Sequence, residues 1–487
     1  MSKEIIEGYR LSPQQKHLWL LGQSERSAVC TVRIDGELNP GLLQQAIQQV
    51  VERFEILRTT FKLLPGMTIP VQIISDRADI EFHTHDHDED AVFVNAAERK
   101  IDYERPPLRA DLISRSSVQH ILIISLPAVS IDAASFQYLL SEIAAAYSGN
   151  ARAEETMQYA DFAEWQNELL EGEAGSVARR FWKNQDLSNA VKFSFEKRTG
   201  AETAFQRAVL PLEIPAARIK AIGNPSSFLL ACWQILIARL TGSSNPVTGV
   251  LFDGRKFSEL ENAIGLFSAF LPMRAPLSND LSFKNLLQQL TTIEQESQRW
   301  QEYFSWDQIA SSESVRDRFF PFCFEFHKRA EMLSAGNVKF SLYERDACID
   351  RFAIKFVVDD CDDRFRASLQ FDTGVFEIDD VTRLANQLKT LIEDASLRPD
   401  SASGDLEMLS DEERQLVLGE FNPPESPGPT QTVTELFEAQ VFGSPDDVAL
   451  VCETEMLNRR ELNARANQLA HYHEAWCWTR CDSRFVS

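Results

Sequence analysis

The chain has 487 residues, enough for two or three domains, and 44% of them are apolar, which excludes a disordered protein. Its formal net charge of -24, from 49 basic and 73 acidic residues, disfavours nucleic acid and anionic membranes as partners. We find no apolar run of transmembrane length and no secretory signal pattern, so we expect a cytoplasmic protein without a membrane partner.

The first part of the chain predicts a short helix, a strand and a longer amphipathic helix. Ser12 fits an N-cap and Pro13 the first helical position. Residues 29–34 predict a strand, and a turn follows at residues 35–36. Residues 41–57 then carry apolar side chains at helical spacing, which predicts a helix with one buried face.

Three histidines, His83, His85 and His87, stand at alternate positions. In an extended segment their rings would share one face, and zinc binds such rings. Acidic residues surround them, and no cysteine or second cluster nearby supplies the further ligands that a tight site needs. We therefore prefer a solvated surface loop and predict no metal site.

The centre of the chain predicts a buried strand, a tight loop and a helix. Residues 121–129 form an apolar run of strand length. From Phe136 to Tyr147, apolar residues recur every three or four positions, which is typical of one helix face. Asp132 lies between the two elements, where its carboxylate can accept hydrogen bonds from the free amides of the first helical turn.

The second half alternates helices and strands in the same way. Phe322, Phe324 and Phe326 alternate along one segment and predict a core strand. Cys232 lies on a helix face as a small buried hydrophobe, and the eight cysteines contain no CxxC pair, which favours reduced thiols. Helices are predicted at residues 227–240 and 381–392, and further strands at residues 247–252, 354–358 and 367–371.

Several segments, taken in order, resemble the motifs of nonribosomal peptide synthetase condensation domains. Residues 12–19 are similar to the opening SxxQ element with its Leu-Trp pair, and residues 53–61 to RHxxLRTxF with Phe54 in place of the histidine. Residues 158–166 resemble YxDFAxW, and residues 264–274 resemble IGxFVNTLPxR with changes in its centre. The ordered set supports the resemblance better than any single motif.

The active-site motif of that family is HHxxxDG, and residues 127–133 read PAVSIDA. The resemblance keeps the aspartate as Asp132 and puts Ala128 where the family has the histidine that helps the attacking amine. A methyl group can neither accept nor donate a proton. Ser130 offers little as a base, because a hydroxyl needs its own activator. The resemblance also implies that Arg58 supports Asp132, although its place at a helix end alone would suit the helix dipole.

The resemblance implies an α/β (α+β) fold of two lobes like chloramphenicol acetyltransferase, which form a V-shaped pseudo-dimer with a central tunnel. We expect the N-terminal lobe at residues 1–175 and the C-terminal lobe at residues 176–422. No cofactor is expected to bind directly. The implied partners are the adenylation domains of a synthetase and peptidyl or acyl carrier proteins, whose phosphopantetheine arms would enter the tunnel.

The end of the chain differs in character. Residues 423–432 predict a stiff proline-rich linker, and residues 433–473 resemble the opening of an adenylation domain. The sequence stops before any Gly/Ser/Thr-rich phosphate loop, so we expect no adenylation activity from this truncated fragment. Residues 474–487 lose the expected pattern and predict an irregular tail, for which a premature end or a frameshift is our hypothesis.

Three interpretations of function follow from the resemblance. The family chemistry is amide-bond formation between acyl or aminoacyl thioesters tethered to carrier proteins. Loss of a general base costs typically about 10²–10⁴-fold, so a slow transferase that relies on proximity is one interpretation. A non-catalytic domain that docks carrier proteins or tailoring enzymes is the second, and a remnant of a larger synthetase the third. The missing histidines favour altered or lost transfer chemistry.

Overall fold

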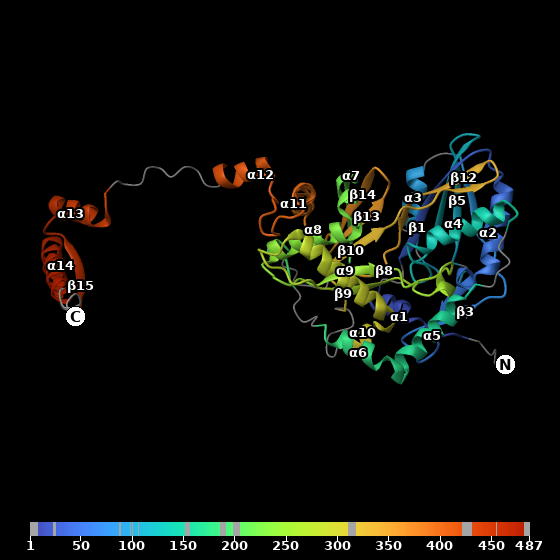
Figure 1. Cartoon of the computed structure of the whole chain (residues 1–487), viewed down its shortest axis with the longest axis horizontal. Coiled ribbons are helices and arrows are strands. Elements are labelled where there is room, and N and C mark those ends of the chain that lie inside the picture. Colours follow the sequence, from blue (N-terminus) through green and yellow to red (C-terminus); the bar gives the residue numbers. More distant parts are fainter. Residues whose placement is uncertain are drawn as a thin grey trace. The chain divides into compact units, whose positions relative to one another are not determined.

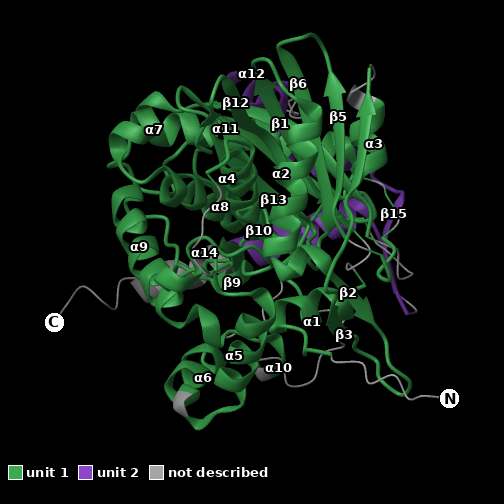
Figure 2. Cartoon of the chain, turned by 90° about the vertical axis from the view of Figure 1, so that its right-hand side faces the viewer, with its two compact units in different colours: residues 1–410 green, residues 411–487 purple. Residues whose placement is uncertain are grey.

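The computed structural model divides the chain into two compact units, residues 1–410 and 411–487 (Figure 2). The first unit contains two six-stranded sheets with their helices, and each sheet forms the centre of one lobe (Figure 1). The structure describes residues 8–22, 26–86, 89–97, 99, 101–105, 107–150, 156–185, 191–197, 205–309, 318–420, 431–453 and 455–481.

The sheet of the first lobe has the strand order β11-β12-β1-β6-β5-β4. β1 lies antiparallel between β6 and β12, while β4 and β5 run parallel. A separate two-stranded sheet joins β2 (Thr59–Lys62) and β3 (Val71–Ile74). The six strands are β1 (Ser27–Asp35), β4 (Glu81–His85), β5 (Arg109–Ser114), β6 (Gln119–Pro127), β11 (Leu333–Ala335) and β12 (Val338–Asp346).

The central strand β6 is buried on both faces, which explains its unbroken apolar run. Leu122 and Ile124 belong to the main core, on the side of α2 (Pro40–Arg53) and α4 (Ser135–Tyr147), two helices that pack on each other. Ile121 and Ile123 belong to a second cluster with Val92 and Ala96 of α3 (Glu89–Ala97). Alternate side chains of one strand therefore fill two different cores.

The second lobe repeats the design with the strand order β7-β14-β13-β10-β8-β9. Helices α8 and α11 pack on each other, and both contact strands of this sheet. The strands are β7 (Arg207–Pro215), β8 (Thr248–Phe252), β9 (Ala269–Met273), β10 (Phe322–His327), β13 (Ile354–Asp360) and β14 (Arg364–Asp372). The helices after β7 are α7 (Ala217–Ile222), α8 (Pro225–Thr241), α9 (Phe283–Trp300), α10 (Trp306–Ile309) and α11 (Ile378–Leu397).

The core strand predicted from alternating phenylalanines is confirmed as β10. Phe322 and Phe324 are fully buried. The ring of Phe324 lies 5.7 Å from that of Phe356, which in turn lies 5.7 Å from the ring of Trp233 on α8. An aromatic layer thus joins the sheet to its covering helix.

Three helices complete the first part of the chain: α1 (Pro13–Leu20), α5 (Tyr159–Glu171) and α6 (Ser176–Lys183). The predicted start of α1 is confirmed. Ser12 Oγ accepts from the amide of Gln15 at 3.1 Å, and Gln15 Oε1 accepts from the amide of Ser12 at 3.0 Å. This reciprocal capping fixes the first turn of α1, which contributes several side chains to the site described below.

The lobe boundary expected at residues 175/176 does not describe sheet membership completely. It assigns β11 and β12 to the second lobe, but both strands belong to the first sheet, where Val29 of β1 pairs with Asp346 of β12. Pairing between residues this far apart leaves no local pattern in the sequence, so hydrophobic periodicity could not reveal it. By joining the first sheet, β11 and β12 connect the backbone of the second half of the chain to the first lobe.

The second unit contains a small antiparallel sheet and its helices. Its elements are α12 (Asp411–Gln415), α13 (Val433–Gly443), β15 (Val448–Cys452), β16 (Glu455–Asn458) and α14 (Arg459–Cys481). Residues 423–430 of the linker predicted at residues 423–432 lie outside the described residues. The predicted irregular tail is wrong for residues 474–481, which continue α14, because the segment contains no glycine or proline to end the helix.

Two properties of the described residues concern membrane insertion and metal binding. None of the helices there combines the length and apolar character needed to cross a membrane. Within the same ranges, no group of three His, Cys, Asp or Glu side chains is placed to hold a metal ion. His85 instead shares a hydrogen bond with Asp111, 2.9 Å from Nε2 to Oδ1, and His87 lies outside the described residues.

Candidate active site

Asp132 lies in the loop between β6 and α4, fully buried in the first lobe. Its Oδ1 accepts from the backbone amide of Ser135 at 2.8 Å, in the first turn of α4. The predicted hydrogen bond from the first turn to the Asp132 carboxylate is therefore confirmed, although the N-cap position of α4 itself is Ala134. The backbone amide of Asp132 donates to the carbonyl of Gly265 at 3.1 Å, which ties the loop to a segment of the second half of the chain.

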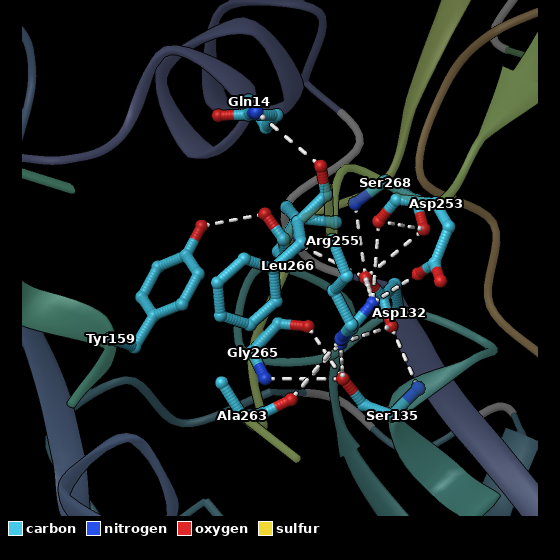
Figure 3. A network of polar contacts seen from close by, with 11 residues as sticks. Gln14, Asp132, Ser135, Tyr159, Asp253, Arg255, Ala263, Gly265, Leu266 and Ser268 are labelled. Atoms are coloured by element: carbon cyan, nitrogen blue, oxygen red, sulfur yellow. Dashed lines mark hydrogen bonds and ion pairs between the residues drawn. The ribbon is translucent and has the colours of Figure 1, made fainter. Parts of the chain in front are cut away.

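The remaining lone pairs of the Asp132 carboxylate are occupied by groups from residues 255–268 (Figure 3). Arg255 donates from both terminal nitrogens, 3.2 Å to Oδ1 and 3.2 Å to Oδ2. Oδ2 also accepts from the amides of Phe267 at 2.9 Å and Ser268 at 3.0 Å, and from Ser268 Oγ at 3.0 Å. No lone pair is left to take a proton from a substrate.

Arg255 is held as firmly as the carboxylate it binds. Its side chain is 1% exposed, it donates to Ser135 Oγ at 2.6 Å, and it lies 4.4 Å from the centre of the Phe267 ring. It also forms an ion pair with Asp253. Gly254 makes this placement possible, because its φ is +76° and an added Cβ would lie 2.2 Å from the carbonyl oxygen of Phe267.

The charge state of Asp132 follows from these contacts. Burial alone would raise the pKa of its carboxyl group. The Arg255 guanidinium and the hydrogen bonds from Ser135 and Ser268 outweigh that effect and hold the pKa of Asp132 below its usual range. Asp132 is thus an ionised, fully bonded carboxylate at neutral pH, which suits a structural role.

The expected pairing of Arg58 with Asp132 is wrong. Arg58 donates to the carbonyl oxygen of Ser75 and forms an ion pair with Glu55, 3.6 Å between Nη2 and Oε1. It ends the 3-10 turn Glu55–Arg58, and its partner Ser75 directly follows β3 of the small two-stranded sheet. Arg255 takes the place that the resemblance suggested for Arg58.

Ala128 and Ser130 flank the loop before Asp132, and both are fully buried. The amide of Ala128 donates to the carbonyl of Arg26 at 2.8 Å, and its side chain is only a methyl group. Ser130 Oγ has no hydrogen-bond partner among the described residues. With no neighbouring base to activate its hydroxyl, Ser130 cannot act as a proton acceptor.

Tyr159, at the start of α5, brings three of the predicted motif segments together. Its hydroxyl donates to the carbonyl of Leu266 at 2.6 Å and lies 2.8 Å from Ser12 Oγ. The approach requires glycine at position 265, because an added Cβ would lie 2.0 Å from the Tyr159 ring. Residues 265–268 therefore fit closely between the first lobe and the rest of the second.

A cavity of about 280 Å³ opens beside this network, and residues from both halves of the chain line it. Ser268, which donates to Asp132, is one of them; Asp132 itself is not. His17 of α1 also lines the cavity, with Nε2 3.2 Å from Asp350 Oδ1 and its ring stacked on Trp306 at 5.7 Å. His17 and Asp350 thus form a histidine–carboxylate contact in the lining of the cavity.

The sequence predicted Asp132 and its helix cap, but it missed Arg255, Ser268 and His17. Arg255 follows a glycine at the end of a predicted strand, a signal too common to single out. Ser268 stood out only as a departure from a motif. His17 belongs to the opening motif, yet its partner Asp350 is 333 residues away, so no spacing pattern links them.

Comparison with known proteins identifies the family. The profile of the condensation domain matches residues 5–418. The chain belongs to the condensation domain family. This match spans both six-stranded sheets and the whole Asp132 network.

Two relatives show the extent of the likeness. This condensation-domain chain is 25% identical over 487 residues to bacitracin synthase 2 of Bacillus licheniformis, which covers 95% of this chain and 19% of the synthase. It is 27% identical over 493 residues to tyrocidine synthase 2 of Brevibacillus parabrevis, with 95% of this chain and 14% of that synthase covered. The chain thus spans less than a fifth of the length of these relatives.

Solved structures confirm the two-lobed α/β fold of this condensation-domain chain. The X-domain from teicoplanin biosynthesis matches 84% of it with 99% of its own length, at a TM-score of 0.69 and 22% identity. The condensation domain of the monacolin K polyketide synthase MokA matches 82% with 100% of its own length, at 0.70 and 17%. A four-domain nonribosomal peptide synthetase matches 97% with 39% of its own length, at 0.71 and 14%.

Proposed function

We propose that this chain is a condensation-type acyltransferase of a peptide synthetase. Its substrates are acyl and aminoacyl thioesters held on the phosphopantetheine arms of carrier proteins, and its product is an amide. Membership of the family and the likeness to bacitracin synthase 2 and tyrocidine synthase 2 support this proposal. The cavity lined by both halves of the chain supplies a place where two tethered reactants could meet.

We further propose that the chemistry no longer uses the position of the motif histidine. Residue 128 carries a methyl group. The Asp132 carboxylate already accepts six hydrogen bonds from groups of the protein. The filled coordination of Asp132 is the observation that carries this proposal, because a carboxylate saturated by the fold positions elements and does not move protons. Asp132 is thus a structural residue, and transfer depends on proximity and on groups elsewhere.

The test is a transfer assay with two carrier proteins, one loaded with an acyl group and one with an amino acid. Intact-protein mass spectrometry follows the mass of each carrier. The proposal predicts that the acceptor carrier gains the mass of the donor acyl group only when the folded chain is present. A chain that binds both carriers and transfers nothing across a panel of acyl donors would overturn it.

The second candidate is a non-catalytic docking domain, and one comparison favours it. The X-domain from teicoplanin biosynthesis, whose fold this chain shares, forms a complex with OxyB of the same biosynthesis. A domain without a motif histidine could use the same scaffold to recruit a partner protein. In the transfer assay this function predicts stable carrier binding without any change in acceptor mass.

For the second unit we propose the opening elements of an adenylation domain. The four-domain synthetase that matches 97% of this chain is bound to AMP and glycine. Apolar side chains of the unit are strongly exposed, with Phe442 at 93% and Val433 at 84%, as expected for elements that a larger domain would cover. We also propose a cytoplasmic location, where the free cysteines among the described residues would stay reduced.

A further inference from the structure

We propose that His17 is the proton acceptor of the transfer reaction and that Asp350 positions it. This inference rests on the proposed function and names the group that replaces the missing motif histidine. His17 lies on α1 and lines the cavity of about 280 Å³, with its side chain 15% exposed. Histidine is the side chain best suited to take up and release protons near neutral pH.

The geometry around the ring fixes its orientation. Asp350 Oδ1 lies 3.2 Å from His17 Nε2 and also accepts from the amide of Arg351 at 2.7 Å, so the carboxylate cannot turn away. The stack on Trp306, with 16° between the two ring planes, holds the imidazole in one plane. A neutral His17 that donates Nε2–H to Asp350 keeps a lone pair on Nδ1, and Nδ1 has no partner among the described residues.

The cavity connects His17 to the Asp132 network. Gln14 lies one helical turn before His17 on α1. Its side-chain amide Nε2 donates to the backbone carbonyl of Phe267 at 3.4 Å (Figure 3). The next residue, Ser268, lines the same cavity and donates to Asp132. A reactant in the cavity can therefore touch His17 on one wall and Ser268 on another.

The other charged groups of the cavity are already paired. Asp307 accepts from Lys16 at 2.6 Å and from Arg318 at 2.9 Å, and Glu171 pairs with Arg10 at 2.6 Å. Asp350 is the carboxylate that contacts the His17 ring. Cys348 is buried, and its thiol donates to the backbone carbonyl of Asp350. Among the lining groups that the structure describes, His17 is the one left to exchange a proton.

The walls also indicate the class of acceptor. Leu20, Phe270, Phe304, Trp306 and Ile349 supply apolar surface, while the charges described above neutralise one another. Such a wall favours an amino acid with an apolar or aromatic side chain over a charged one. The acceptor is therefore an amine whose remaining part is uncharged.

The proposed step balances without another reactant. The amine nitrogen forms a bond to the thioester carbonyl carbon, and the bond from that carbon to sulfur breaks. The proton that the nitrogen gives up goes to Nδ1 of His17 and then to the departing thiolate of the donor arm. The products are an amide on the acceptor arm and a free thiol on the donor arm.

The experiment uses the full chain, a donor carrier loaded with an acetyl group and an acceptor carrier loaded with phenylalanine. The variants are His17→Ala, His17→Gln and Asp350→Asn. The matched control is His85→Ala, because His85 forms the same Nε2 to Asp Oδ1 contact, with Asp111, and does not line the cavity. Circular dichroism checks that each variant is folded, and His17→Gln serves if His17→Ala does not fold.

We expect both His17 variants to slow transfer by about 10²–10⁴-fold, and added imidazole to restore part of the rate of His17→Ala. His85→Ala should keep the wild-type rate. Asp350→Asn should slow transfer less, through a lower kcat at unchanged KM for the carriers, because the imidazole loses the partner that orients it. A merely structural Asp350 would not separate the two constants in this way.

Two outcomes would overturn the inference in distinguishable ways. If the wild type transfers the acetyl group and the His17 variants are as fast, His17 is not the acceptor and the proposed function stands. If the folded wild type binds both carriers and transfers nothing across the panel of acyl donors, the proposed function and this inference both fail.

Discussion

Replacement of Asp132 by asparagine is the most informative perturbation of the fold. In Asp132→Asn an NH2 group takes the place of one oxygen, so either the donors of Oδ1 or the more numerous donors of Oδ2 face another donor. The charge of Arg255, whose side chain is 1% exposed, is then left with Asp253, which is half exposed. Removal of one member of a buried ion pair typically costs about 3–5 kcal/mol of unfolding free energy.

A double-mutant cycle with Arg255→Met separates the ion pair from its surroundings. Because removal of both charges leaves no buried charge uncompensated, Arg255→Met should cost much less in the Asp132→Asn background than in the wild type. We expect a coupling free energy of about 2 kcal/mol or more. Urea unfolding followed by tryptophan fluorescence measures it, since most of the tryptophans lie in residues 1–410.

The control is Glu213→Gln, which removes one member of an exposed ion pair. The side chain of Glu213 is 69% exposed and that of its partner Arg364 is 57% exposed. It should change the unfolding free energy by less than about 1 kcal/mol. If Asp132→Asn were no more destabilising than this control, Asp132 would not hold the lobes together as described here.

The same variant carries a pH signature. The folded-state pKa of Asp132 lies below its unfolded value of about 3.9, so folding favours the ionised form. The stabilisation from this group is complete above about pH 5 and is lost as the pH falls through the folded-state pKa. The stability difference between wild type and Asp132→Asn should therefore be constant from pH 5 to 8 and shrink only in acid.

Three further predictions concern the rest of the chain. Arg58→Ala should cost about 1–2 kcal/mol, through one hydrogen bond and one partly exposed ion pair, against about 3–5 kcal/mol for Arg255→Ala, as thermal unfolding would show. Gly265→Ala should destabilise by about 1–3 kcal/mol, because its Cβ would meet the Tyr159 ring at 2.0 Å. Gly41→Ala on α2, whose Cβ would only reach ordinary contact with Asn39 Oδ1 at 3.5 Å, should be neutral or stabilising, and equal effects of the two in the same unfolding assay would contradict the close fit. Cys232 and Cys323, whose thiol pKa values burial raises, should resist iodoacetamide in the folded protein while exposed Cys452 reacts, and peptide mass spectrometry of native and denatured samples checks this.

Local patterns predicted much of this fold, for physical reasons visible in particular elements. Ser12 and Pro13 mark the start of α1 because capping depends on neighbours in sequence, and the apolar run of β6 marks a strand because both of its faces are buried. The pairing of β12 with β1 had no such local mark.

In the site, too, local contacts were predictable from the sequence and contacts between distant residues were not. Asp132 was predictable because its carboxylate accepts from the first amide of the helix that follows in the sequence. Its partner was misassigned to Arg58, since several arginines lie near helix ends and only the tertiary fold brings Arg255 to Asp132. The contact between His17 and Asp350 likewise exists only after both halves of the chain have folded.

The central claim is that a condensation-type domain transfers acyl groups although its motif position 128 carries a methyl group. The most direct measurement is the single-turnover rate of the wild-type chain with loaded donor and acceptor carriers, read by intact-protein mass spectrometry. We predict amide on the acceptor carrier at a rate well above that of the carriers alone. An acceptor carrier whose mass never changes, in the presence of a folded chain that binds both carriers, would contradict the account.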